Sequence, residues 1–420
     1  MNKSLGNLFK GDKVVWMVFF FLCIISVVEV FSASSTLTFK GASYWSPVMK
    51  HVGILVLGLF CMIVTLNIKC KYFKVMTPFF IILSFIMLIW VLVAGQATND
   101  ASRWVSFFGL QFQPSEIAKG TMVLATAQIL SGTQTEDGAD KHAFWWILMT
   151  CGGMILLIAV ENFSTAALIC CILFMMMVIG RVPARQLGGL MSVVAIVAVI
   201  GFCTIMFVGD TKDAQEKPSD DNTEVVADNA QKEKKSGAGY KIFHRASLWK
   251  QRILDFADNK EVPPDSVDIV GKGAQVAYSN IAIASSGFVG VGPGNSETRD
   301  FLSQAFSDFI FAIVVEELGL LGAGLVAFFY IVLLLRAAVI AKRCENTFPA
   351  FLVMGLALML VTQAMMNMWV AVGLAPVTGQ PLPLVSKGGT SSIINCIYIG
   401  AILSISRSAK KRDAGKGEEG

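Results

Sequence analysis

The chain has 420 residues, of which 55% are hydrophobic and 15% are charged, and its formal net charge is +4. Soluble domains carry about 25% charged residues, so this composition excludes a purely soluble fold and predicts an all-α polytopic membrane protein. The net charge is small and its basic residues flank apolar runs, which excludes a nucleic-acid-binding function.

Ten apolar runs follow one another, most of them near the ~20 residues that a helix needs to cross ~30 Å of hydrocarbon. They are 14–33, 48–68, 75–95, 114–131, 143–160, 163–180, 186–208, 305–335, 347–373 and 388–406. The first run follows a basic N-terminus, and its length and Glu29 favour an uncleaved span over a cleaved signal peptide. The runs predict about ten transmembrane helices in a single membrane domain that spans 1–420.

The distribution of Lys and Arg predicts the orientation of these helices. With the N-terminus in the cytoplasm, the basic segments 69–74, 336–343 and 407–420 all fall inside. This excess matches the positive-inside rule and places both termini, including the basic tail 407–420, in the cytoplasm. The long segment 209–304, between the seventh and eighth helices, then forms a large extracytoplasmic loop.

This loop changes character along its length. Residues 211–239 contain no aromatic side chain and many mixed charges, which predicts a flexible insertion. Residues 240–256 mix Phe, Trp, Leu and Ile with Lys and Arg, which is typical of an amphipathic helix at the membrane interface. An ordinary amphipathic packing helix is the alternative. Residues 274–288 suggest a short helix or a re-entrant piece, followed by glycine-rich turns.

The eighth apolar run carries three carboxylates, Asp308, Glu316 and Glu317, although ionised groups inside a hydrophobic span are costly. At ~1.5 Å per residue, the two glutamates lie ~12–14 Å further along a helix than Asp308. Asp308 would therefore lie at the outer mouth of the span, where a functional acid can reach water. The two glutamates would lie within the bundle as structural hydrogen-bonding groups.

Three further polar segments open on the same side of the predicted bundle, at 98–120, 160–166 and 374–392. In the first, Pro114 and Glu116 suit the start of a helix, and Lys119 can share a helix face with Glu116. The last is rich in proline and glycine, and irregular backbone at membrane level is tolerated only when it is buried in protein or lines a polar cavity. An anionic substrate that approaches from the outer leaflet fits this arrangement.

Three stretches carry a resemblance to a known family: RW and QPSEIAK within 103–119, GNS and SDFIFAIVVEELG within 294–319, and PVTGQPLPLVSKGGTSS at 376–392. On these residues the chain resembles the SEDS family (shape, elongation, division and sporulation), the FtsW/RodA-type membrane proteins, over roughly 14–407. The resemblance implies an inverting peptidoglycan glycosyltransferase of the bacterial cytoplasmic membrane, which polymerises lipid II with a lipid-pyrophosphate leaving group and an active site facing the periplasm. The charged insertion and the basic tail favour the FtsW-like branch, which acts in cell division.

The resemblance also implies roles for individual residues. Asp308 corresponds to the catalytic aspartate of the family. Residues expected to bind substrate are Arg103, Trp104, Glu116, Lys119, Arg245, Gln275, Arg299, Ser386 and Lys387. Residues expected to be structural are Glu316, Glu317, Glu161 and Asn162. Four positions depart from the usual motifs: Gln304 and Phe306 replace an acid and a histidine, Asn162 replaces an acid, and Lys387 replaces a tyrosine.

The expected partners are lipid II, a class B penicillin-binding protein that acts as a transpeptidase, and other membrane proteins of the division machinery. A divalent cation, Mg²⁺ or Mn²⁺, is compatible with pyrophosphate chemistry, although the sequence has no dedicated ligand cluster and implies no certain cofactor. Two alternatives stay open. A lipid II flippase would use the intramembrane acids Glu29, Glu316 and Glu317, and a non-catalytic scaffold would activate a penicillin-binding protein without needing Asp308.

Overall fold

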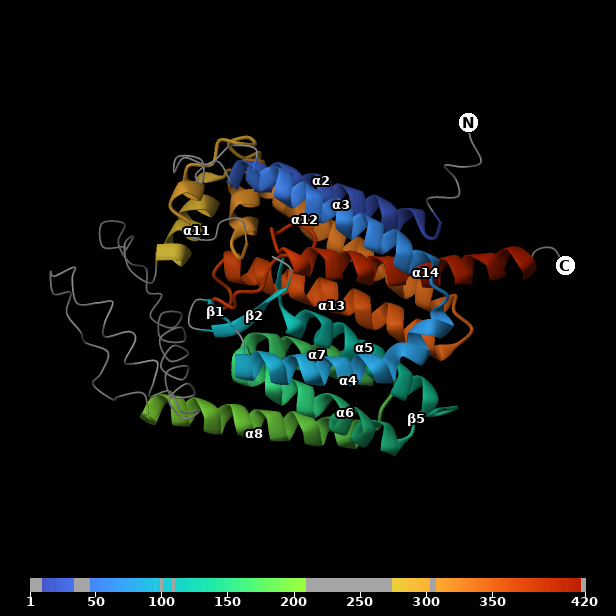
Figure 1. The fold of residues 1–420 in the computed structure, drawn as a ribbon. Coiled ribbons are helices and arrows are strands. Elements are labelled where there is room, and N and C mark those ends of the chain that lie inside the picture. Colours follow the sequence, from blue (N-terminus) through green and yellow to red (C-terminus); the bar gives the residue numbers. More distant parts are fainter. Residues whose placement is uncertain are drawn as a thin grey trace. The chain divides into compact units, whose positions relative to one another are not determined.

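The computed structural model describes residues 10–33, 46–94, 96–98, 101–107, 110–208, 274–302 and 307–416 (Figure 1). Helices dominate these residues. Their bounds are α2 (Lys13–Ala33), α3 (Ser46–Asn67), α4 (Cys70–Ala94), α5 (Pro114–Gly132), α6 (Lys141–Glu161), α7 (Phe163–Ile179), α8 (Ala184–Val208), α11 (Ala274–Ser285), α12 (Ile310–Lys342), α13 (Thr347–Ala371) and α14 (Thr390–Lys416).

Each of the ten predicted apolar runs coincides with a helix, which confirms the all-α polytopic class. Among the described residues, seven helices are long and apolar enough to cross a membrane: α2, α3, α4, α6, α12, α13 and α14. α7 and the stretch Ala184–Val197 of α8 are shorter apolar helices. α5 carries Glu116 and Lys119 in its first turns. The number of spans, ten, therefore stays a prediction.

The chain divides into two compact units, one formed by 1–187 and 268–420 and the other by 188–267. In the second unit the structure describes only α8 as far as Val208. The predicted flexible insertion at 211–239 and the predicted interfacial helix at 240–256 lie outside the described residues.

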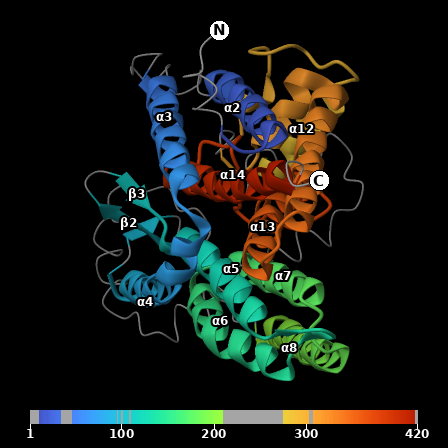
Figure 2. The same ribbon diagram turned by 90° about the vertical axis from the view of Figure 1, so that its right-hand side faces the viewer.

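In the first unit, α14 lies between α3 and α13, and α12 packs against both α2 and α13 (Figure 2). The outward faces of the helices carry large apolar side chains, such as Phe60 and Trp90, which are more than half exposed. The interior holds polar groups as well as apolar ones, among them Lys119 and Glu317. This distribution suits a bundle surrounded by lipid, because buried polar groups then bond to one another while apolar side chains face hydrocarbon.

The segment between α4 and α5 forms a three-stranded antiparallel sheet that the sequence analysis did not predict. Its strands are β1 (Gln96–Thr98), β2 (Ala101–Phe107) and β3 (Leu110–Phe112), in the order β1-β2-β3. A second, two-stranded hairpin joins β4 (Gln134–Thr135) to β5 (Gly138–Ala139). α5 then begins at Pro114, as predicted, because proline suits the first turn of a helix.

α12 is broken at Gly319, where the backbone has φ 68° and ψ −171°. The break leaves carbonyl groups without partners inside the helix. The glycine-rich segment after α11 provides the missing donors. The N–H groups of Val291 and Gly292 donate to the carbonyls of Glu316 and Glu317, at 3.0 and 2.9 Å. A polar backbone that is bonded in this way is tolerated inside a membrane protein.

Glycine is required on both sides of this contact. A Cβ on Gly319 would lie 2.4 Å from the backbone nitrogen of Gly290, and a Cβ on Gly290 would lie 2.3 Å from the carbonyl oxygen of Glu317. The two backbones therefore approach more closely than any side chain allows. The predicted short helix before these turns is confirmed as α11.

Candidate functional site

The four polar segments singled out in the sequence meet at one end of the bundle. This end contains the start of α12, the end of α13, the loop 372–389, the start of α5 and the junction between α6 and α7. In Figure 1 it is the end marked by β1 and β2, whereas the start of α2 and the end of α14 lie at the opposite end. Hydrogen bonds between side chains and backbone connect the segments.

Asp308 lies in the turn just before α12 and is half-buried. Ser307 Oγ donates to Asp308 Oδ1 at 2.9 Å. The Nδ2 group of Asn367, on α13, donates to the backbone oxygen of Asp308 at 2.8 Å. Ser386 Oγ, from the loop 372–389, donates to the backbone oxygen of Ser307 at 2.6 Å. Two distant parts of the chain therefore fix the position of the aspartate.

The loop that carries Ser386 is irregular and is buried from Leu382 to Ser386, and side chains from three helices anchor its backbone carbonyls. Asn367 and Gln363 of α13 donate to the carbonyls of Gln380 and Pro381, at 2.7 and 3.1 Å. Ser26 Oγ of α2 donates to the carbonyl of Val385 at 2.7 Å, and Tyr330 OH of α12 donates to the carbonyl of Pro383. Gln380 in turn donates to Thr165 Oγ1 of α7, at 2.7 Å.

Leu384, within this loop, has a φ of 65°, a left-handed conformation that is costly for a branched side chain. Such conformations cost about 1–3 kcal/mol and persist only where the surroundings fix them. The bonds on either side of Leu384 provide that constraint. The loop is therefore held rigidly beside Asp308.

Lys387 follows directly and is half-buried. Burial lowers the pKa of its ammonium group below the ordinary value, and the positive charge of the neighbouring Lys50 lowers it further. Two cations thus lie near one another at this end of the bundle, one on the loop and one at the start of α3. Lys50 was missed as a candidate because a lysine at the mouth of an apolar run is an ordinary feature of a transmembrane sequence.

Glu116 and Lys119 form the predicted pair on one face of α5, with Lys119 Nζ 2.8 Å from Glu116 Oε1. Lys119 Nζ also donates to Gln363 Oε1 at 2.9 Å, and Ser391 Oγ donates to Glu116 Oε2 at 3.2 Å. Lys119 was expected to bind substrate, but it is fully buried. A buried side chain cannot contact a substrate in this conformation. The pair instead joins α5 to α13 and α14.

The junction between α6 and α7 lies against the start of α5. Asn162 caps α7, since its side-chain oxygen accepts from the backbone N–H of Thr165 at 3.2 Å. Glu161 and Asn162 line a cavity of about 20 Å³ together with Pro114 and Ser115. A cavity of this volume has room for about one water molecule and not for a sugar.

Arg299 and the two glutamates of α12 lie deeper in the bundle. Glu316 accepts from the hydroxyls of Ser296 and Thr298 and from the backbone N–H of Glu297. Arg299 Nη1 donates to Ser32 Oγ of α2 at 2.9 Å, and it lies 3.9 Å from Glu317 Oε1. The guanidinium group is thus directed toward α2 and α12.

Several predicted residues are placed only in part. Arg103 and Trp104 lie on β2, where Trp104 pairs with Gln96, but their side chains are outside the description. Gln275 is half-buried on α11. Arg245, and the departures at Gln304 and Phe306, lie outside the described residues. In the described part of the chain, no three or more His, Cys, Asp or Glu side chains gather to hold a metal ion.

The structure also identifies residues that sequence reasoning missed, chiefly Gln363 and Asn367 on α13. They lie four residues apart, so they share one helix face and both reach the buried loop. The sequence did contain an indication of their importance, because two polar amides inside a long apolar run must find hydrogen-bonding partners. Those partners lie far away along the chain and could not be identified from the order of residues alone.

The comparisons with known proteins cover almost the whole chain. The family model of the FtsW/RodA/SpoVE cell cycle proteins matches residues 12–411. The chain is 27% identical to a probable peptidoglycan glycosyltransferase FtsW of Geobacter sp. (strain M18), over 94% of this chain and 96% of that protein. It is also 27% identical to the peptidoglycan glycosyltransferase MrdB of Escherichia coli (strain K12), over 94% of this chain and 93% of that protein.

Solved structures share the fold. A chain from "Structural coordination of polymerization and crosslinking by a peptidoglycan synthase complex" matches with a TM-score of 0.66 at 21% identity, covering 95% of this chain and 98% of that chain. The rod shape determining protein RodA of Thermus thermophilus matches with a TM-score of 0.60 at 20% identity, covering 96% and 98%. The similarity extends over nearly the full length of each protein.

Proposed function

Because the chain belongs to the FtsW/RodA/SpoVE family of cell cycle proteins, we propose that it is a peptidoglycan glycosyltransferase of the cytoplasmic membrane. It polymerises lipid II into glycan strands at the outer, periplasmic face. The names of two relatives that match over almost the whole chain support this activity. The observation that carries the proposal is the position of Asp308, which is fixed from α13 and from the buried loop.

In the proposed reaction, Asp308 acts as a general base. Its carboxylate accepts the proton of the sugar 4-hydroxyl of the acceptor lipid II, and that oxygen attacks the anomeric carbon of the growing glycan. The bond to the pyrophosphate breaks with inversion at that carbon, and lipid pyrophosphate leaves. A general base contributes about 10²–10⁴ in rate when it lies within hydrogen-bonding reach of the proton.

The departing pyrophosphate needs positive charge close to it, because stabilising developing charge is a large part of catalysis. Lys387 and Lys50 are the described cations that lie near one another at this end of the bundle. The lowered pKa of Lys387 supports this role, since an anion placed beside two neighbouring ammonium groups relieves their repulsion. Arg103 and Arg245 stay candidates for the same role on the strength of the family resemblance.

The other predicted substrate residues take positioning roles in this proposal. Ser386 holds the loop against the backbone of Ser307. Glu116 and Lys119 hold α5 against α13 and α14. Arg299 bonds to α2 and to the loop over the break in α12. Each acts on the reaction through the geometry of Asp308 or of the loop.

We propose a class B penicillin-binding protein as the partner, together with other membrane proteins of the division machinery. The similarity to a chain from a peptidoglycan synthase complex that coordinates polymerisation and crosslinking supports such a partner. The relatives at 27% identity include both FtsW and MrdB proteins, so the septal role rests on the charged insertion at 211–239 and on the basic tail.

The flippase alternative is favoured by one observation, the buried acids of α2 and α12. Glu29 has no exposed area, and no described residue bonds to either of its carboxylate oxygens. Glu316, in contrast, is fully engaged with Ser296, Thr298 and the backbone of Glu297, as expected of a structural group. Glu29 therefore fits a residue that could take up and release a proton during transport, whereas Glu316 fits a structural role.

The test is polymerisation of labelled lipid II by the protein purified with its cognate penicillin-binding protein. Asp308→Asn keeps the size of the side chain and removes the base, so we expect a fall of about 10²–10⁴ in polymerisation rate. Asp137→Asn makes the same change on the exposed turn between β4 and β5 and serves as the matched control. The thermal midpoint of each variant and its recovery in the complex check folding.

The outcomes separate the alternatives. Equal polymer from the wild type and from Asp308→Asn would remove Asp308 from the mechanism and favour the scaffold. No polymer from any variant, with lipid II still moving across the bilayer of reconstituted vesicles, would favour the flippase. Loss of polymer in Asp308→Asn alone, with the complex intact, supports the proposed base.

A further inference from the structure

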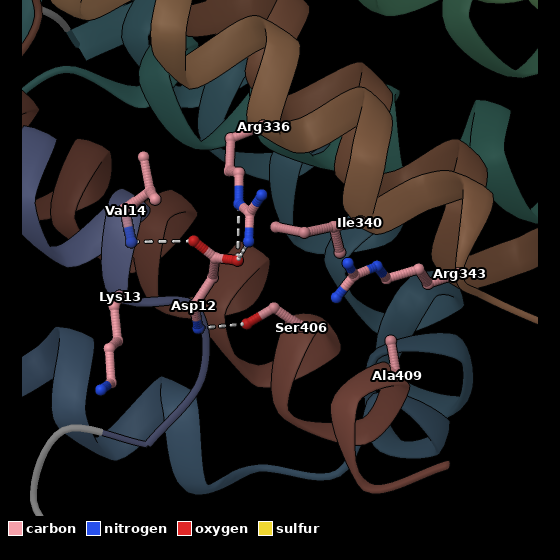
Figure 3. Close-up of a pocket in the computed structure, with 8 residues that line it drawn as sticks. All are labelled: Asp12, Lys13, Val14, Arg336, Ile340, Arg343, Ser406 and Ala409. Atoms are coloured by element: carbon pink, nitrogen blue, oxygen red, sulfur yellow. Dashed lines mark hydrogen bonds and ion pairs between the residues drawn. The ribbon is translucent and has the colours of Figure 1, made fainter. Parts of the chain in front are cut away.

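A cavity of about 290 Å³ lies at the end of the bundle that contains the start of α2, opposite the end with the start of α12 (Figure 1). Figure 3 shows the residues that line it. It is formed where the start of α2, the last turns of α12 and the last turns of α14 come together. Arg336 lies 28 residues after Asp308, which corresponds to about 40 Å along a helix. The cavity is therefore separate from the site described above.

One wall of the cavity is an ion pair between α2 and α12. Arg336 Nε and Nη2 both lie 2.7 Å from Asp12 Oδ2. The other oxygen, Asp12 Oδ1, accepts from the backbone N–H of Val14 at 2.9 Å. Both carboxylate oxygens are thus engaged, and Asp12, the one acid among the described residues of the lining, is already neutralised by its partners.

The entry into α2 is packed directly onto α14. The backbone N–H of Asp12 donates to Ser406 Oγ at 2.9 Å. Gly11 has a φ of 100°, and a Cβ there would lie 2.8 Å from the carbonyl oxygen of Leu403. Three segments that are far apart in sequence are therefore held in fixed positions, and the cavity is a built feature.

The other charged residues that the structure describes in the lining are basic. Lys13 and Arg343 line the cavity together with the Asp12–Arg336 pair, and the guanidinium group of Arg343 extends from α12 toward the ends of α2 and α14 (Figure 3). Arg336 uses Nε and Nη2 on Asp12, and no described residue accepts from its Nη1. A guanidinium group has five N–H donors, so Arg336 keeps donors for a further acceptor.

These features match the chemistry of phosphate recognition. The planar guanidinium group presents paired donors to phosphate oxygens, and basic pockets between transmembrane helices bind lipid headgroups. Small-molecule pockets measure about 300–1,000 Å³, so this cavity suits a ligand at the small end of that range. Its position at the ends of membrane-crossing helices places it at the depth of headgroups.

We propose that this cavity binds the phosphate group of an anionic ligand, with Arg343 and Lys13 as its main contacts. The phosphate comes from an anionic phospholipid headgroup or from free phosphate. Binding there joins the starts and ends of three helices and stabilises the bundle at this end. The proposal is independent of the glycosyltransferase activity.

The first arm of the test measures lipid binding to the full chain by native mass spectrometry, with phosphatidylglycerol or phosphatidylcholine added to the detergent-purified protein. We expect the wild type to retain phosphatidylglycerol in preference to phosphatidylcholine. In Arg343→Gln we expect about fivefold weaker retention, because one basic residue near a membrane surface contributes about that factor to the binding of an anionic lipid. Lys342→Gln is the matched control, since it removes the same charge from an exposed neighbour that does not line the cavity. Lys13→Gln tests the second contact from a different helix.

The second arm distinguishes the two sources of phosphate. Inorganic phosphate is added to the protein in nanodiscs of phosphatidylcholine, and the thermal midpoint is measured for the wild type, Arg343→Gln and Lys342→Gln. A rise in the wild type and in Lys342→Gln that is absent in Arg343→Gln assigns the site to free phosphate. Selective retention of phosphatidylglycerol without that rise assigns it to the headgroup. Equal losses in Arg343→Gln and Lys342→Gln, or no response in either arm, would overturn the proposal.

Discussion

The two ends of the bundle are held together in different ways. At the end that contains Asp308, amides and hydroxyls from α2, α12 and α13 bond to the carbonyls of an irregular buried loop. At the other end, the ion pair between Asp12 and Arg336 fastens regular helix ends to one another. The first end therefore depends on shape and on full hydrogen bonding, whereas the second depends more on charge.

The largest expected effect on stability is at the break in α12. Gly319→Ala places a Cβ 2.4 Å from the backbone of Gly290 and forces alanine into a conformation that is essentially restricted to glycine. We expect a loss of about 4 kcal/mol or more, or failure to fold, measured by thermal and chemical denaturation in detergent. Gly324→Ala, in the same helix but with open space around it, is the control and is expected to be near neutral. A tolerated Gly319→Ala would mean that the loop does not need this contact.

The next largest effect on stability is expected at the same end, at the buried pair Glu116–Lys119 on α5. Lys119→Met leaves Glu116 buried without its cation, which costs about 3–5 kcal/mol. Because the cost arises from the uncompensated charge, the double variant Glu116→Gln/Lys119→Met is expected to recover part of the lost stability. Denaturation of the single and double variants checks this. If the double variant is as unstable as the sum of the two single variants, the pair does not act as a unit.

The smallest effect is expected at the opposite end. The side chain of Arg336 is 31% exposed and that of Asp12 is 9% exposed, so solvent and salt screen their attraction. A double-mutant cycle of Asp12→Asn and Arg336→Gln should give a coupling of about 1 kcal/mol, which decreases as the salt concentration rises. A coupling that does not change with salt would show that this end also depends on shape and not on charge.

Much of the architecture was predictable from local patterns. The apolar runs predicted the positions of the helices, because a helix that faces lipid must be apolar over most of its length. Pro114 predicted the start of α5, and the spacing of Glu116 and Lys119 predicted their pair. The three strands after α4 were missed, since they are short and lie between polar residues without the long alternation that marks a strand.

The class of the protein, the positions of its helices and the polar segments that build the site all followed from the order of residues. These properties depend on composition and on neighbours a few residues apart. Which groups meet became visible only in the folded chain: Asn367 and Ser386 at Asp308, Gly290 at Gly319, and Asp12 at Arg336. The physical reason is that a buried polar group must be bonded, but its partner is selected by the packing of helices far apart in sequence.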